Sequence, residues 1–313
     1  MKYAIETNEL TRVHGNTRAL DGVTVQIRAN TITGLLGRNG AGKTTFMSLA
    51  TAQDRPTSGA VTVLGKPPFE RAEVLEQLCF IRDNQRYPDD YKLKHALRAA
   101  KIFYPNWDQQ LADELVSLFR IPEKTIVKKF SRGQFSALGI VLGLASRAPI
   151  TFFDEPYLGL DATARGYFYD LLLREYQRHP RTIVISTHLI DEMDRLLERV
   201  VILDRGRVVR DADVEGLRGA AHQVTGRAAA VDGYLVGRTV LSRQRVGGLA
   251  TAVVDGAISA EDRAAAEVID LDLSAVSLQQ LVAAYGFDAA DSIHQDETSV
   301  PEVALATSEG ANS

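Results

Sequence analysis

The chain of 313 residues is short of cysteine and of net charge, and each shortage excludes a class of protein. Its one cysteine, Cys79, cannot form an intramolecular disulfide, which excludes a disulfide scaffold and suits a reducing cytosol. The formal net charge of −4 provides no basic surface of the kind that holds nucleic acid. We therefore expect a cytoplasmic protein without a nucleic-acid partner.

Long apolar runs are also missing. The longest apolar region, Ala137 to Phe153, is interrupted by Arg147 and Pro149, whereas a membrane-spanning helix needs about 18 clean apolar residues or more. The start of the chain, Met1 to Glu6, contains no apolar core of a signal peptide. We expect no segment that spans a membrane, so any link to a membrane would pass through partner chains.

A glycine-rich loop is the most informative feature that is present. Residues 37–44 have the sequence Gly-Arg-Asn-Gly-Ala-Gly-Lys-Thr, which fits the phosphate-binding pattern G-x-x-x-x-G-K-[ST] at every fixed position. Residues 31–36 predict a buried strand before the loop, and residues 44–50 predict a helix after it. Such a loop turns its backbone N–H groups toward phosphate oxygens at the positive end of a helix. The alternative for residues 37–44 is an ordinary glycine turn with a surface lysine. It is disfavoured because both the flanking strand and the flanking helix are predicted.

The loop predicts how ATP and Mg²⁺ would be bound. Lys43 would reach the β- and γ-phosphates, and the hydroxyl of Thr44 would ligate Mg²⁺. The candidate nucleotide-binding residues of the loop are Gly37, Asn39, Gly40, Ala41, Gly42, Lys43, Thr44 and Thr45.

An acidic strand end supplies the second half of a hydrolytic site. Residues 150–156 have the sequence Ile-Thr-Phe-Phe-Asp-Glu-Pro, which predicts a buried parallel strand with carboxylates at its C-terminal edge. Asp154 would hold the Mg²⁺ shell. Glu155 would act as the general base for a water that attacks the γ-phosphate. The alternative is that Asp154 and Glu155 belong to an ordinary acidic turn before Pro156. The presence of the glycine loop in the same chain makes this alternative less favoured.

Three further segments narrow the class. Ser131 precedes a predicted helix, where it would form an anion site or an ordinary helix cap. Asp161 ends the sequence Gly-Leu-Asp shortly after the acidic strand. Residues 182–188 predict a strand that ends in His188, at the ligand edge of the sheet. A surface or core histidine is the plainer alternative for His188.

Taken in order, these segments resemble the nucleotide-binding subunit of an ATP-binding cassette (ABC) transporter, from about residue 3 to residue 216. The resemblance implies a P-loop NTPase with the ABC-cassette fold, an α/β fold with an antiparallel β subdomain and a helical subdomain at about residues 89–147. It also implies a dimer in which two subunits enclose two ATP–Mg²⁺ complexes. This dimer would drive a separate transmembrane permease.

The resemblance assigns roles to individual residues. Ser131, Gly133 and Gln134 stand in the family's signature, which contacts the γ-phosphate bound to the other subunit. Asp161 falls on the family's D-loop, and His188 falls on its switch histidine. The catalytic residues that the resemblance implies are Glu155, His188 and Lys43.

The chain departs from the family's pattern in three places. His14 stands where an aromatic residue, usually Tyr, stacks on adenine, and its smaller ring would stack less area. Phe130 and Arg132 replace the first and third residues of the signature Leu-Ser-Gly-Gly-Gln, and Arg132 would add charge at the composite site or disturb it. In the glutamine loop, direct alignment places Asp83 at the Gln position, and Gln85 fits only after a shift of two residues. Either residue would complete the Mg²⁺ site.

Composition changes beyond residue 219. We expect an ABC ATPase domain at 1–219, a small C-terminal α+β extension at 220–288, and a disordered tail at 289–313 that is polar and acidic. Such an extension is similar to those of many drug- and peptide-exporter ATPases. The extension's apolar pieces predict strands at residues 233–240, 250–254 and 268–273, and a capping box at 277–280 predicts a helix that stops at Gly286.

The function that the resemblance implies is that of the ATP-binding and ATP-hydrolysing subunit of a membrane ABC transporter. Its partners would be a permease and a second copy of the chain or a paired ABC ATPase subunit, at the inner face of the cell membrane. A degenerate or regulatory ABC protein that binds ATP with little hydrolysis is one alternative. A soluble ABC ATPase of translation or DNA repair is less favoured, because the chain has one phosphate loop and no room for a coiled coil between Lys43 and Asp154.

Overall fold

The computed structural model describes residues 2–285, and it begins with an antiparallel sheet in which β1 pairs with three other strands. Ile5 and Leu10 of β1 are fully buried and share an apolar core with side chains of α1. The strands of this sheet are β1 (Tyr3–His14), β2 (Thr17–Val23), β3 (Gln26–Arg28) and β5 (Ser58–Val63).

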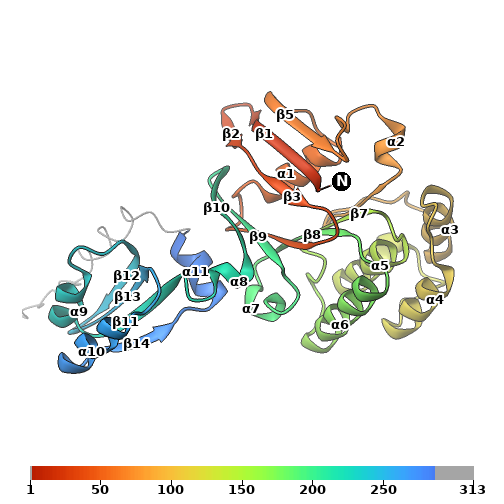
Figure 1. The fold of residues 1–313 in the computed structure, drawn as a ribbon. Helices are drawn as coiled ribbons and strands as arrows, with labels where there is room; N and C mark the ends of the chain where they lie inside the picture. Colours follow the sequence, from red (N-terminus) through yellow and green to blue (C-terminus); the bar gives the residue numbers. More distant parts are fainter. Residues whose placement is uncertain (1, 286–313) are drawn as a thin grey trace, which may run out of the picture.

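A six-stranded sheet with the order β10-β9-β4-β8-β7-β6 crosses the centre of the molecule (Figure 1). Its strands are parallel except for β10, which forms a hairpin with β9. β4, β7 and β8 are buried along their whole length, as in a sheet covered on both faces. The strands are β4 (Ile32–Leu36), β6 (Leu78–Ile81), β7 (Ile150–Asp154), β8 (Thr182–Thr187), β9 (Arg199–Asp204) and β10 (Arg207–Asp213).

The parallel arrangement brings the carboxyl ends of three central strands to one edge. Leu36 pairs with Thr187 at the ends of β4 and β8, and Asp154 pairs with Ser186 at the ends of β7 and β8. The segments that follow these strands therefore begin side by side, which is where such sheets bind ligands.

Helices cover both faces of the central sheet. α3, α4 and α5 form a group at one side of the molecule (Figure 1). The helices of this part are α1 (Lys43–Ala50), α2 (Ala72–Leu75), α3 (Leu93–Phe103), α4 (Gln109–Leu118), α5 (Arg132–Ala145), α6 (Ala162–Arg178), α7 (Ile190–Met193) and α8 (Val214–Leu217), with the 3₁₀ turn η1 (Val127–Lys129).

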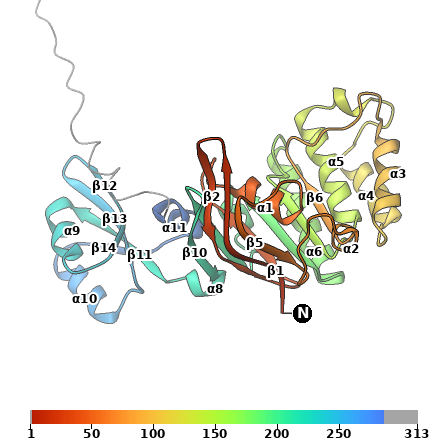
Figure 2. The ribbon, with the colours of Figure 1, turned by 90° about the horizontal axis from the view of Figure 1, so that it is seen from above.

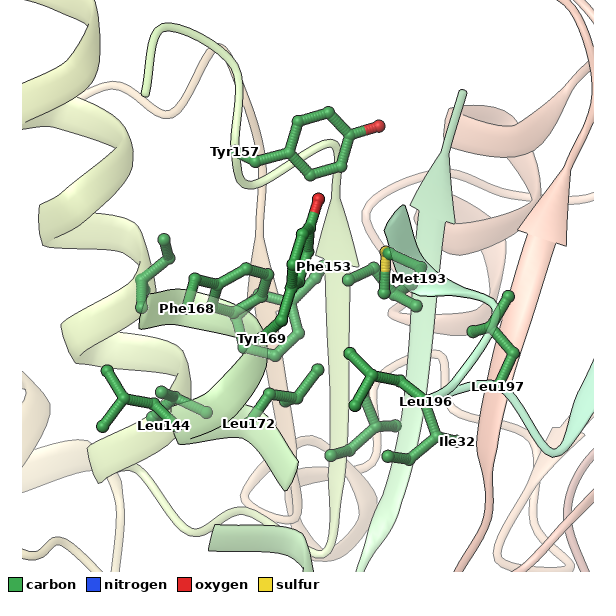
Figure 3. Close-up of a cluster of buried hydrophobic side chains, with 14 of the residues drawn as sticks. Ile32, Leu144, Phe153, Tyr157, Phe168, Tyr169, Leu172, Met193, Leu196 and Leu197 are labelled. Carbon is green, nitrogen blue, oxygen red and sulfur yellow. The ribbon is translucent and has the colours of Figure 1, made fainter. Parts of the chain in front are cut away.

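Two apolar cores lie on opposite faces of the central sheet. One lies between this sheet, α1 and the antiparallel sheet. The other, which we call the helix-side core, includes Phe153 of β7, Phe168 and Leu172 of α6, and Met193 of α7. Figure 3 shows these side chains packed together. Full burial of one such side chain stabilises the fold by about 1.5–3 kcal/mol.

Residues 221–275 form a separate sheet with its own core. The order of elements is strand, helix, strand, strand, helix, strand, and the sheet order is β12-β13-β11-β14, which is the split βαβ topology of ferredoxin-like folds. Val224, Val231 and Val254 are fully buried in its core. The elements are β11 (Ala221–Arg227), α9 (Ala228–Leu235), β12 (Val240–Val246), β13 (Leu249–Asp255), α10 (Ala260–Val268) and β14 (Asp272–Ala275).

The last described helix, α11 (Leu278–Tyr285), returns toward the central sheet and contacts α7. Both ribbon views place it between the C-terminal sheet and β10 (Figures 1 and 2). The backbone N–H of Gln280 donates to Ser277 Oγ at 3.2 Å, and the N–H of Ser277 donates to Gln280 Oε1 at 2.8 Å, which is the geometry of a capping box. The predicted stop at Gly286 and the predicted tail at 289–313 lie outside the described residues.

Two strands expected in this region are wrong. Residues 233–235 belong to α9, which buries Ala228, Val231 and Tyr234 on one face, a helical period that the alanine-rich sequence hides. In the second segment, Val268 ends α10, and its side chain points to solvent with 85% exposure. Asp270 then adopts a positive φ of 55°, which breaks any extended run, and β14 starts only at residue 272.

Within residues 2–285, no helix is both long enough and apolar enough to cross a membrane.

Candidate nucleotide site

The glycine loop lies between β4 and α1, and close neighbours explain its glycines. A Cβ on Gly37 would lie 2.2 Å from the carbonyl oxygen of Leu203, and one on Gly42 would lie 2.6 Å from that of Ala19. Both glycines also have positive φ, 140° and 106°. Side chains at these positions would push the loop away from β9 and β2, so the curled backbone depends on glycine.

Lys43 is the first residue of α1, and its ammonium lies inside the loop. Its Nζ donates to the carbonyl oxygens of Gly37 at 2.8 Å and Arg38 at 3.1 Å, and 6% of the side chain is exposed. Burial lowers the pKa of Lys43, and the nearby carboxylates of Glu155 and Asp154 act in the opposite direction. Phosphate oxygens entering the loop would take the place of these two carbonyl partners.

Asp154 receives hydroxyl hydrogen bonds from two neighbouring elements. Thr44 Oγ1 donates to Oδ2 at 2.6 Å, and Ser186 Oγ donates to Oδ1 at 2.6 Å. The carboxylate and the two hydroxyls are hard oxygen donors of the type that Mg²⁺ prefers. The residues therefore fit Mg²⁺, with Thr44 and Asp154 as the groups that would hold it. The ion would supply charge neutralisation for the phosphates.

Glu155 lies where the ends of β7 and β8 meet α1. Its Oε2 is 3.0 Å from Nδ1 of His188, and its Oε1 is 3.9 Å from Nζ of Lys43. The backbone of Glu155 has a positive φ of 47°, and its N–H donates to Ser186 Oγ at 2.9 Å. The structure thus brings together the three side chains expected to be catalytic, although they come from three separate segments.

Tyr157 contacts both His188 and the preceding residue, Thr187. Its hydroxyl donates to Thr187 Oγ1 at 2.8 Å and accepts from the backbone N–H of His188 at 3.0 Å. The two rings meet edge to face with centroids 5.6 Å apart. Figure 3 shows the Tyr157 hydroxyl directed away from the apolar side chains. Burial raises the pKa of Tyr157 to about 12, so the hydroxyl keeps its proton as a donor.

Sequence reasoning missed Ser186 and Tyr157. Ser186 lies in β8 two residues before His188, and its pairing with Asp154 becomes visible only when β7 and β8 are aligned side by side. Tyr157 gave no local signal, because its partners on β8 are about 30 residues away in the sequence.

The signature residues form the start of α5. Ser131 Oγ accepts from the N–H of Gln134 at 3.2 Å, and Gln134 Oε1 accepts from the N–H of Ser131 at 3.0 Å. Ser131 is exposed, and Gly133 is half-buried against the carbonyl oxygen of Gly159. Across residues 2–285, no hydrogen bond or ion pair joins these residues to Lys43.

Arg132 and Asp83, two of the departures from the family's pattern, contact each other. Arg132 Nη2 is 3.2 Å from Asp83 Oδ2, with side chains 62% and 39% exposed. Gly159, at a positive φ of 82°, lies so close that a Cβ there would be 2.8 Å from Arg132 Cγ. Arg132 therefore joins the segment after β6 to the turn after β7.

Asp161 caps α6, where its Oδ1 accepts from the N–H of Ala164 at 2.8 Å. One turn later, Arg165 forms a forked pair with Glu192 of α7 through two contacts of 2.9 Å, and its Nη1 donates to the carbonyl oxygen of Leu160 at 3.2 Å. The loop that carries Asp161 is thereby tied to the helix that follows His188.

Within residues 2–285, no hydrogen bond or ion pair joins His14 or Gln85 to the cluster of Lys43, Asp154, Glu155 and His188. His14 ends β1 with a half-exposed side chain, and its Nε2 is 3.7 Å from Asp54 Oδ2. Gln85 is exposed, and its backbone N–H donates to the carbonyl oxygen of Arg82 at 3.3 Å. Their assignments to adenine stacking and to the Mg²⁺ shell stay predictions.

Comparisons with known proteins agree with this geometry. A family model described as "ABC transporter" matches residues 20–158. The chain is 31% identical over 227 residues to the uncharacterized ABC transporter ATP-binding protein YcbN of Bacillus subtilis, which covers 70% of this chain and 72% of the relative. It is 27% identical to the daunorubicin/doxorubicin resistance ATP-binding protein DrrA of Streptomyces peucetius, over 69% of this chain and 67% of DrrA.

A solved structure titled as the ATP-binding subunit of an ABC transporter matches with a TM-score of 0.61 and 24% identity, over 68% of this chain and 91% of that one. The fold and the site thus define a P-loop NTPase with an ABC cassette. The chain belongs to the family of ABC transporter ATP-binding proteins.

Proposed function

We propose that this chain binds Mg–ATP, hydrolyses it, and drives a separate membrane permease. The observation that supports hydrolysis most directly is the meeting of Glu155, Lys43 and His188 at the strand ends beside Asp154. Glu155 would accept the proton of the attacking water. Lys43 would hold the β- and γ-phosphates, and His188 would contact the γ-phosphate while it bonds to Glu155. ATPase activity is general for this family, and the relatives named as transporter subunits favour transport over translation or repair.

A second copy of the chain, or a paired ABC subunit, would complete the site. The capped start of α5 is exposed and has no bond to Lys43 within the described chain. In a two-fold dimer, Ser131 and Gly133 of each copy would face the phosphate loop of the other, and ATP would lie between them. ATP binding would favour the closed dimer and hydrolysis would release it. The dimer would work at the inner face of the cell membrane, held there by the permease.

The test is the release of inorganic phosphate from Mg–ATP by the purified chain, followed by identification of the membrane protein that co-purifies with the full-length chain. We expect Mg²⁺-dependent release and an integral membrane partner. Nucleotide binding without phosphate release would instead favour a regulatory ABC protein. Arg132 and Asp83, which depart from the family's pattern, are the residues that suggest this alternative. A soluble ribosomal or DNA-bound partner would contradict the transport proposal.

A further inference from the structure

α7 is a helix of one turn that starts two residues after His188, so its position fixes where the backbone of His188 leaves β8. One side of α7 is tied to α6, because Glu192 accepts the fork of Arg165 and a hydrogen bond of 3.2 Å from the hydroxyl of Tyr169. Such a short helix contributes little stability of its own and depends on the elements packed around it.

The other support of α7 comes from the end of the described chain. α11 contacts α7 directly. Leu281 and Val282 of α11 are buried in the helix-side core together with Ile190 and Met193 of α7. None of these side chains belongs to the core of the C-terminal sheet. α11 therefore packs as part of the ATPase core. In the sequence, the whole C-terminal sheet lies between α11 and the rest of that core.

α11 is also bonded to the C-terminal sheet. Nε2 of Gln280 donates to Oε1 of Gln223 on β11 at 3.3 Å, and Val253 of β13 is buried in the same helix-side core as Leu281. Near the junction, Arg218 Nη2 after α8 lies 3.3 Å from Asp194 Oδ2 after α7. A displacement of the sheet would therefore be passed to α7 through contiguous contacts.

We infer that the C-terminal region (residues 221–285) positions His188 by holding α7 through α11, and that this contact sets the rate of ATP hydrolysis. The inference rests on the proposed ATPase function. Weakening the contact would let α7 move, and His188 would then lose its place against Glu155 and Tyr157. The phosphate loop makes no part of this contact, so the hydrolysis rate would fall more than the affinity for ATP.

The experiment compares Leu281→Ala with a matched control in the full-length chain. Leu281 has 2% exposure and lies in the helix-side core, whereas Val231 has 0% exposure and lies in the core of the C-terminal sheet. We expect Leu281→Ala to lower kcat for Mg–ATP roughly 2- to 30-fold, with KM changed less than kcat. Val231→Ala should leave both unchanged. Thermal unfolding of both variants checks that they are folded, and the milder Val282→Ala replaces Leu281→Ala if the latter does not fold.

A second measurement separates this inference from the ATPase proposal. The ring signals of His188 in the NMR spectrum, assigned with His188→Gln, report its position without any turnover. We expect them to shift in Leu281→Ala and to stay in place in Val231→Ala. Unchanged His188 signals in Leu281→Ala, or equal shifts in both variants, would overturn the inference. A parental chain that releases no phosphate, with His188 still displaced by Leu281→Ala, would contradict the ATPase proposal and the effect on its rate, but not the positioning of His188 through α11.

Discussion

The phosphate loop and the start of α5 carry the two halves of the candidate site, and they are supported in different ways. Lys43 and Asp154 are buried and bonded to partners within the chain. Ser131 and Arg132 are exposed, and the bonds of Ser131 serve only to cap its helix. The phosphate loop must be organised before nucleotide binds, and it is built into the core. The start of α5 would meet a partner subunit, and it lies at the surface. Substitutions should therefore have large effects in the first half and small effects in the second.

The largest effect is expected at Glu155. Glu155→Gln removes the base but leaves the hydroxyl contacts of Asp154 in place, so ATP binding should persist while hydrolysis falls about 10²- to 10⁴-fold. Trapped ATP should hold the dimer closed. Phosphate release and sedimentation in Mg–ATP measure both results, with the exposed Glu114→Gln as control. Hydrolysis at the parental rate would show that Glu155 is not the base.

Lys43 should have the next largest effect, on binding. Lys43→Ala removes a buried cation from the loop, and a hydrogen bond to a charged group is worth about 1.5–3 kcal/mol, so ATP affinity should fall about 10- to 100-fold. Calorimetric titration gives the affinity, and circular dichroism checks the fold. Lys128→Ala, an exposed lysine paired with Asp89, is the matched control. Equal affinities for Lys43→Ala and the parental chain would refute the phosphate-loop assignment.

A smaller effect is expected at Arg165, which ties the loop of Asp161 to α7. Arg165→Ala removes the fork to Glu192 and the bond to the carbonyl of Leu160, which should lower kcat roughly tenfold. Arg165→Lys keeps the charge but loses the fork, and should restore only part of the rate. Arg174→Ala removes another arginine of the same helix, which pairs with Glu114 and Glu175 and not with α7, and serves as control. Steady-state ATPase assays that find Arg165→Ala and Arg174→Ala equal would count against a role for the fork.

The smallest effect is expected at Arg132. Because its pair with Asp83 is largely exposed, breaking it should change ATP-driven dimerisation less than about fivefold. If Arg132 touches the nucleotide of the partner copy, Asp83→Asn should free it and raise the dimer fraction, whereas Arg132→Gly should lower it. Sedimentation in the Glu155→Gln background measures both, with ATP affinity unchanged. Changes of the same sign would assign Arg132 to the contact within its own chain.

How much the sequence predicts depends on how local the information is. The loop at residues 37–44 and the strand that ends at Asp154 carry their own patterns, and the family resemblance to which they contribute predicted the α/β ABC-cassette fold. The support of His188 by Tyr157 was not predictable, because it joins segments about 30 residues apart that share no pattern. In the C-terminal region, the apolar residues at 228–235 satisfy a helical face and a strand run equally well, and only packing against β13 decides between them.

The late position of α11 in the chain has a consequence for synthesis. A ribosome completes α7 before it makes the C-terminal sheet and α11, and the intervening residues take on the order of ten seconds at about 5–20 residues per second. During that time Ile190 and Met193 lack the cover that Leu281 later provides. A newly made chain therefore keeps part of this apolar surface uncovered, next to His188, until α11 has been made and packs against α7.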